Sequence, residues 1–143
     1  MAVTTWGYDD TSIFFNLREL TVVDLSQNNL SGEVDVLFAP KLKHANFIHN
    51  NFTTVNSYKK FKGLYKTLQV CDLSYYSIQQ EARKLMKNMP PTIEQLFLSE
   101  NQIHSILSTS LERQVNFRQL HMGNNLLSGE LPDFQHCFQI CRF

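Results

Sequence analysis

The stretch LTVVDLSQNNLSGEVD, residues 20–35, has a second version near the other end of the chain, LHMGNNLLSGELPD at residues 120–133. Both stretches contain paired asparagines and a Ser-Gly-Glu sequence. In the first, apolar residues stand at Leu20, Val23 and Leu25, and are followed by Asn28 and Leu30. Counted from Leu20, these residues lie at offsets 0, 3, 5, 8 and 10, a spacing that can be sought along the rest of the chain.

The same spacing occurs five times. The copies begin at Leu20, Leu42, Leu68, Ile93 and Phe117, so the periods are 22, 26, 25 and 24 residues. Offset eight holds Asn28, Asn50, Tyr76, Asn101 and Asn125. Only Tyr76 departs from the chemical type expected at its position. Self-similarity at such a period indicates stacked repeats in which each unit buries its apolar row against its neighbours.

This pattern resembles the leucine-rich repeat, whose core reads L-x-x-L-x-L-x-x-N-x-L. NNLSGEV and LLSGELP are similar to the ending of plant-type repeats, and MPPTIEQLFLSENQI resembles some protozoan repeats. The resemblance covers residues 17–134. It implies an α/β fold: a right-handed superhelical solenoid of about five repeats, with a parallel β-sheet on the concave face and an irregular or short-helical convex side.

The residue types explain the pattern physically. The central apolar-x-apolar alternation predicts a short strand with one buried face, and neighbouring strands would stack about 4.8 Å apart. The resemblance implies a hydrogen-bonded column of asparagines, Asn28, Asn50, Asn101 and Asn125. Tyr76 interrupts it. We expect the third turn to splay or Tyr76 to point outward, and Tyr76→Asn to raise the melting temperature.

The chain divides into three predicted parts. Residues 1–16 are expected to form an N-terminal capping segment, with Trp6, Tyr8, Ile13, Phe14 and Phe15 covering the first coil. Residues 17–139 form the repeat domain. Residues 140–143 are the start of a truncated sixth repeat, counted with Ile140 at offset zero and Phe143 at offset three. Exposed apolar residues at this uncapped end, Phe134, Phe138, Ile140 and Phe143, predict end-to-end association.

Helix-forming residues predict one convincing helix. Residues 79–88 carry apolar side chains on one face, and Pro90 and Pro91 end the pattern. Segments 53–67 and 110–116 are candidates for short helical turns, whereas 31–40 and 128–134 are expected to be extended or irregular.

Bulk composition excludes several function classes. The formal net charge is zero, which argues against global attraction to nucleic acid. No apolar run is long enough for a membrane-spanning helix. The first residues lack a signal-peptide pattern, and three cysteines cannot all pair internally. These cues lean towards a cytoplasmic location, or an extracellular one if the chain is a piece of a receptor-like protein.

A search for catalytic chemistry finds no nucleotide-binding, hydrolase or zinc-protease motif. The five histidines, His44, His49, His104, His121 and His136, do not show ligand spacing. Cys71 stands at a core position, so we expect a buried inert thiol. No catalytic residue, cofactor or metal is predicted. Two N-x-[ST] sequons, at Asn29 and Asn51, arise from the repeat pattern itself.

The better functional signal is geometric, because residues beside the buried strand positions would point outward on the concave face. Three outward columns are predicted, through offsets two, four and six, and the candidate residues come from the first two. The proposed partner-binding residues are Asp24, His44, Asn46, Asp72, Gln95, Phe97, Gln119 and His121. Phe97 is the best candidate anchor, since aromatic residues dominate interface energies. Alternatively, Phe97 stacks on neighbouring side chains and binds nothing.

The leading hypothesis is a non-enzymatic interaction module that binds a protein or peptide on this face. Two alternatives stay open. The chain could be a truncated fragment of a longer receptor-like array without independent function. It could also bind acidic partners or nucleic acid through the lysines between Lys41 and Lys66, because residues 36–71 carry six lysines and no acid.

Overall fold

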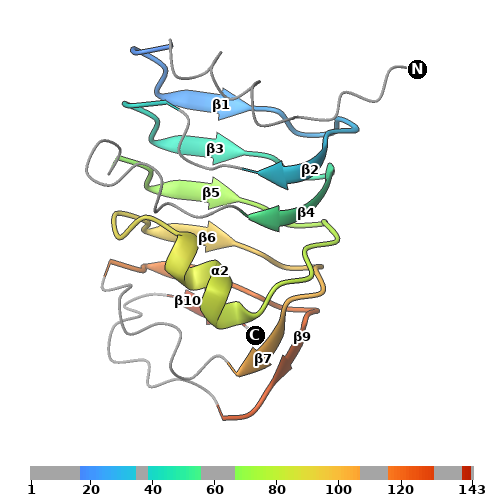
Figure 1. Ribbon diagram of the computed structural model, residues 1–143. Helices are drawn as coiled ribbons and strands as arrows, with labels where there is room; N and C mark the ends of the chain where they lie inside the picture. The colour runs from blue at the N-terminus through green and yellow to red at the C-terminus, as the bar shows by residue number, and fades with distance from the viewer. Residues whose placement is uncertain (1–16, 35–38, 56–66, 107–115, 131–139, 143) are drawn as a thin grey trace.

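The computed structural model describes residues 17–34, 39–55, 67–106, 116–130 and 140–142. Within these residues, six short strands form one parallel sheet (Figure 1). In spatial order they are β1 (Val22–Asp24), β3 (His44–Asn46), β5 (Val70–Asp72), β6 (Gln95–Phe97), β8 (Gln119–His121) and β10 (Ile140–Arg142). The first five strands come one from each predicted copy of the repeat, and the predicted solenoid with a parallel sheet is confirmed.

One row of side chains faces inward along the whole ladder. The register pairs Val23 with Ala45, and the row continues through Cys71, Leu96 and Leu120. Exposure along this row falls from 9% at Val23 to 0% at Leu120. Full burial of one such aliphatic side chain contributes about 1.5–3 kcal/mol, so the stacked row is a major stabilising element. Offsets zero, five and ten add further buried residues to the same core, among them Leu68, Leu73 and Ile78.

Two smaller parallel sheets follow the main strands. β2 (Ser31–Val34) pairs with β4 (Asn51–Val55), and β7 (His104–Ile106) pairs with β9 (Leu126–Ser128). Figure 1 shows β2 and β4 beside the first strands of the ladder and β7 and β9 beside its other end. Residues 31–34, at the start of the segment 31–40 predicted as extended or irregular, therefore form a paired strand.

The third turn carries a helix, α2 (Ala82–Asn88), which begins three residues later than the predicted start at residue 79. The preceding residues are held in extended backbone. Gln80 accepts a hydrogen bond from the Val55 amide at 2.9 Å and donates to the Val55 carbonyl at 3.2 Å, while Glu81 forms a parallel bridge with His104. Ala82, Leu85 and Met86 are buried on the predicted face. Of the other predicted helical turns, residues 53–55 belong to strand β4, because they pair with β2. The rest falls almost entirely on residues 56–66 and 107–115, outside the described part of the chain.

Polar residues just before the first apolar position of a turn also link neighbouring turns. The Thr67 hydroxyl donates to the Leu42 carbonyl and the Thr92 hydroxyl to the Leu68 carbonyl, each at 2.8 Å. The side chain of Asn116 donates to the Pro91 carbonyl at 2.7 Å. These bonds occupy carbonyl groups where the chain enters the ladder.

The last strand joins the ladder in a register other than the one counted from the sequence. Cys141, not Phe143, lies opposite Leu120, and Ile140 lies opposite Gln119. The last turn spans only 21 residues from Leu120 to Cys141, so the count based on a longer period was wrong by two residues. The expected capping segment, residues 1–16, and the aromatic residues Phe134 and Phe138 lie outside the described residues.

Candidate functional site

The asparagines at offset eight bond to backbone groups of their own turn and of the turn before. The Asn50 side-chain amide donates to the carbonyls of Leu25 and Phe47, at 2.8 and 2.7 Å, and its oxygen accepts from the Leu30 amide at 3.0 Å. The same arrangement is made by Asn101 and Asn125. Asn28, in the first turn, donates only within its own turn and is exposed.

Tyr76 occupies the equivalent slot in a different way. Its side chain is only 6% exposed, and its ring lies 5.6 Å from the Phe52 ring. The ladder stays continuous here, because the Phe47 amide donates to the Asp72 carbonyl at 3.0 Å. The expectation of a splayed turn or an outward tyrosine is therefore wrong: the apolar area of the ring favours burial against Phe52.

The polar end of Tyr76 is less well accommodated. Its hydroxyl is buried and makes no hydrogen bond to the described residues. Desolvation raises the pKa of this phenol, an effect that the neighbouring Asn50 amide only partly offsets.

A row of exposed residues lies at offset seven, directly before this slot. Each adopts left-handed backbone, with φ between 55° and 62°, and the five residues are Gln27, His49, Tyr75, Glu100 and Asn124. The His49 and Tyr75 rings lie 4.7 Å apart, and Tyr75 is 50% exposed. Sequence reasoning missed this aromatic pair. The available signal was that the two residues share one offset in consecutive turns.

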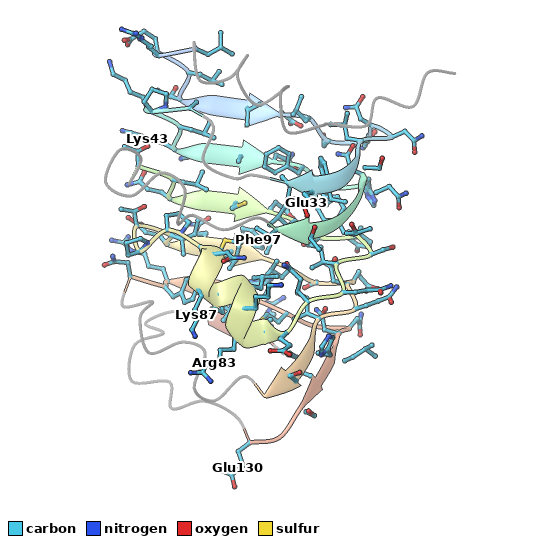
Figure 2. The ribbon with its side chains drawn as sticks, in the orientation of Figure 1. Glu33, Lys43, Arg83, Lys87, Phe97 and Glu130 are labelled. Carbon is cyan, nitrogen blue, oxygen red and sulfur yellow. The ribbon has the colours of Figure 1, made fainter. Side chains whose placement is uncertain are left out.

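The strand register brings the eight predicted partner-binding residues onto two adjacent rows of the sheet, on the face opposite the core. We call this the outward face. Column one contains His44, Gln95 and Gln119. Column two contains Asp24, Asn46, Asp72, Phe97 and His121. Asp24 and His44 are exposed and the other six are half-buried. Figure 2 places Phe97 on β6, in the middle of the ladder.

The first three members of column two also hold their own turns. One side-chain oxygen of Asp24 accepts from the Ser26 amide at 2.9 Å, and Asp72 accepts from the Ser74 amide at the same distance. The side-chain oxygen of Asn46 likewise accepts from the Ile48 amide, at 3.2 Å. The side-chain nitrogen of Asn46 also donates to the Asp24 carboxylate. The hydrogen bonds from Ser26 hold the pKa of Asp24 below its usual value. Sequence reasoning missed this local role, which Asx residues two positions before a turn amide commonly take.

The next two members of column two form an aromatic pair. The Phe97 and His121 rings meet edge to face, with centroids 4.9 Å apart. Nε2 of His121 is buried and has no hydrogen-bond partner among the described residues. Burial, together with the positive charge of Arg142, lowers the pKa of His121. Column two thus changes from polar side chains that cap turns to a neutral aromatic pair.

Other candidate chemistry is sparse in the described part of the chain. Lys41 forms an exposed ion pair with Glu19 at 2.7 Å, whereas Lys43 is exposed (Figure 2). The remaining lysines of the 41–66 run lie outside the described residues. Cys71 is fully buried, and desolvation raises the pKa of its thiol. Among the residues with described positions, no group of three potential ligands could hold a metal ion.

Comparison with known proteins adds two matches. The family model for the Leucine Rich Repeat matches residues 19–40. The Receptor-like protein EIX1 of Solanum lycopersicum is 27% identical over 117 residues, a match that covers 82% of this chain and 11% of that protein. The chain therefore spans about a tenth of the length of this relative.

Within the described ranges, no helix has the length and apolar character needed to cross a membrane.

Repeat solenoids of this kind present extended surfaces to other proteins, and both matches indicate a protein-interaction module. The repeated turns and the parallel ladder form a leucine-rich repeat solenoid, and the two matches support a leucine-rich repeat protein.

Proposed function

We propose that the outward face of the six-stranded sheet binds a protein or peptide, and that the module acts by binding rather than by catalysis. The observation that carries this proposal is the register: eight accessible or half-accessible side chains stand in two adjacent rows. Five rungs at the strand spacing extend over about 20 Å, which suits a short peptide or one side of a small domain.

Rigidity supports the same proposal. The inner strands are paired on both sides, so the backbone that carries the outward side chains is fixed before a partner arrives. Side-chain capping at Asp24, Asn46 and Asp72 further orders the strand ends. A pre-ordered surface loses less conformational entropy on binding. Phe97 would act as the central anchor, because buried aromatic groups commonly dominate interface energies.

The proposal can be tested by partner capture with matched variants. The intact chain is compared with a double variant on the outward face, Phe97→Ala with His121→Ala. A second double variant, Arg83→Ala with Lys87→Ala, serves as control, because these exposed side chains extend from α2 (Figure 2). We expect partners to be lost only by the outward-face variant. Equal recovery by the intact chain and the outward-face variant would overturn the assignment of the binding face.

The salt dependence of binding distinguishes the proposed function from the alternative of binding acidic partners or nucleic acid through lysines. Binding through many lysines to nucleic acid would weaken by about a thousandfold or more between 50 and 200 mM salt. The ion pair of Lys41 with Glu19 reduces the support for that alternative, because this lysine is already paired with an acid. We expect the salt dependence of partner capture to be much shallower.

A further inference from the structure

We infer that the partner presents an arginine or lysine side chain to a patch formed by Asp72, Phe97 and His121, here called the acidic-aromatic patch. This inference rests on the proposed function, since it assumes that the outward face is the binding surface. It adds the chemistry of the group that the surface receives.

The three residues occupy consecutive rungs of column two. Asp72 on β5 lies directly opposite Phe97 on β6, and Phe97 lies opposite His121 on β8. Neighbouring rungs are about 4.8 Å apart, so a single side chain of the partner can contact the carboxylate and the Phe97 ring at once. The edge-to-face contact with His121 fixes the orientation of the Phe97 ring.

Charge on this part of the face favours a cation. One oxygen of Asp72 accepts the Ser74 amide, and the other has no partner among the described residues. Asp24, two rungs away in the same column, carries a second negative charge. Arg142 lies directly opposite His121, at the end of the patch away from Asp72, and it stands three rungs from Asp72, about 14 Å at the strand spacing. That distance exceeds the screening length of about 8 Å at physiological salt, so Arg142 does not neutralise the carboxylate.

The pairing of an acid with an aromatic ring selects among partner groups. A cation is attracted both by the carboxylate and by the face of an aromatic ring. Arginine fits better than lysine, because its planar guanidinium can stack on a ring while it donates to a carboxylate. An anionic group would be repelled by Asp72. A purely apolar group would remove water from the carboxylate without replacing its hydrogen bonds.

Selection from a random peptide library tests this inference, with the intact chain as the immobilised target. Recovered peptides are located on the protein by NMR chemical-shift mapping and re-measured against three variants. Asp72→Asn keeps an oxygen for the Ser74 amide but removes the charge. Phe97→Leu keeps an apolar side chain but removes the ring. Glu130→Gln is the control, because it removes an exposed carboxylate that lies away from the outward face (Figure 2).

We expect peptides that map to the outward face to carry arginine or lysine, and to bind about tenfold more weakly to Asp72→Asn and to Phe97→Leu. Glu130→Gln should change the affinity by less than about threefold, because this carboxylate lies outside the outward face. Replacing the peptide's arginine by neutral citrulline should reproduce the loss seen with Asp72→Asn.

Two other outcomes separate the inference from the proposed function. Peptides that map to the outward face but bind equally well to Asp72→Asn, or with citrulline in place of arginine, would overturn the cationic assignment and leave the binding face intact. A library that yields only peptides mapping to other surfaces, or none that bind, would overturn both.

Discussion

The third and fourth turns place different side chains at the same buried position of the repeat. At offset eight, the third turn has Tyr76 and the fourth has Asn101, and the two side chains are almost equally buried, at 6% and 7% exposure. Asn101 bonds to four backbone groups, whereas the Tyr76 hydroxyl bonds to none among the described residues. The preceding residues nevertheless adopt the same backbone, with φ of 62° at Tyr75 and 59° at Glu100.

This difference shows that the asparagine does not determine the shape of the turn. The parallel ladder and the left-handed residue before the slot persist when the asparagine is absent. What the asparagine supplies is hydrogen bonds to backbone groups that would otherwise be buried without partners. Tyr76 replaces this contribution with apolar contact against Phe52. The comparison therefore predicts that removing the polar group lowers stability in the fourth turn and raises it in the third.

The largest effect is expected for Asn101→Ala. The change leaves the carbonyls of Leu73 and Leu98 and the Ile78 amide without the bonds that the asparagine makes. Each buried unsatisfied group costs about 1–3 kcal/mol, so the free energy of unfolding should fall by about 3 kcal/mol or more. Urea unfolding of the two proteins measures this difference. The control is Asn28→Ala, whose exposed side chain bonds only its own turn and should cost less than about 1 kcal/mol. Equal losses would contradict the distinction.

A smaller loss of stability is expected for Tyr76→Asn, whereas the sequence alone predicted a higher melting temperature for this variant. The substitution removes the buried ring and its contact with Phe52, at a cost of about 3–5 kcal/mol for an aromatic side chain in a core. New bonds to backbone groups would return about 1 kcal/mol each. We therefore expect a net destabilisation of about 2 kcal/mol by thermal or urea unfolding. A gain in stability would show that the hydrogen bonds outweigh the packing of the ring.

Tyr76→Phe should act in the other direction. It keeps the ring and removes a buried hydroxyl that lacks a partner in the described structure. The expected gain is about 1 kcal/mol, visible as a higher urea midpoint with an unchanged slope. A loss of stability would mean that the phenol oxygen is bonded, with the Asn50 side-chain nitrogen as the candidate donor.

The smallest effect concerns the acid sensitivity of the first turn. Hydrogen bonds from Ser26 hold the pKa of Asp24 below its usual value in the folded chain. A lowered folded-state pKa stabilises the fold above the unfolded pKa, near 3.9, and this contribution is lost as the pH falls through the folded value. Unfolding measured between about pH 5 and pH 2 should therefore show a shallower decline for Asp24→Asn than for the parent chain. Parallel declines would contradict this role.

The fold could be predicted from the sequence because buried strand residues recur at fixed spacings. Each strand contributes one inward residue between two outward ones, so Val23, Ala45 and Cys71 mark the ladder by their spacing alone. The same logic placed Asp24, Asp72 and Phe97 in one outward column. Their use as a binding surface stays a prediction, because spacing specifies where a side chain stands and not what it contacts.

Other features could not be obtained from spacing. The position of Tyr76 depends on a competition between an unbonded hydroxyl and ring packing against Phe52, which lies one turn away. The later start of α2 depends on Gln80 bonding to Val55, again in another turn. The register of β10 depends on the length of the last turn, which spans 21 residues from Leu120 to Cys141 and is shorter than the periods counted from the sequence. In each case the deciding contact lies between turns.

Distance measurement by pulsed electron paramagnetic resonance tests the stacked ladder most directly. Spin labels are attached at Val22→Cys and Gln119→Cys, which lie in column one on the first and fifth rungs, while Cys137 and Cys141 are replaced by serine and the buried Cys71 stays unlabelled. Four steps of about 4.8 Å predict a single narrow distribution centred near 20 Å, broadened by the label arms. Labels that lie several times farther apart, or that give two separate populations, would contradict the continuous parallel ladder on which the proposed binding face depends.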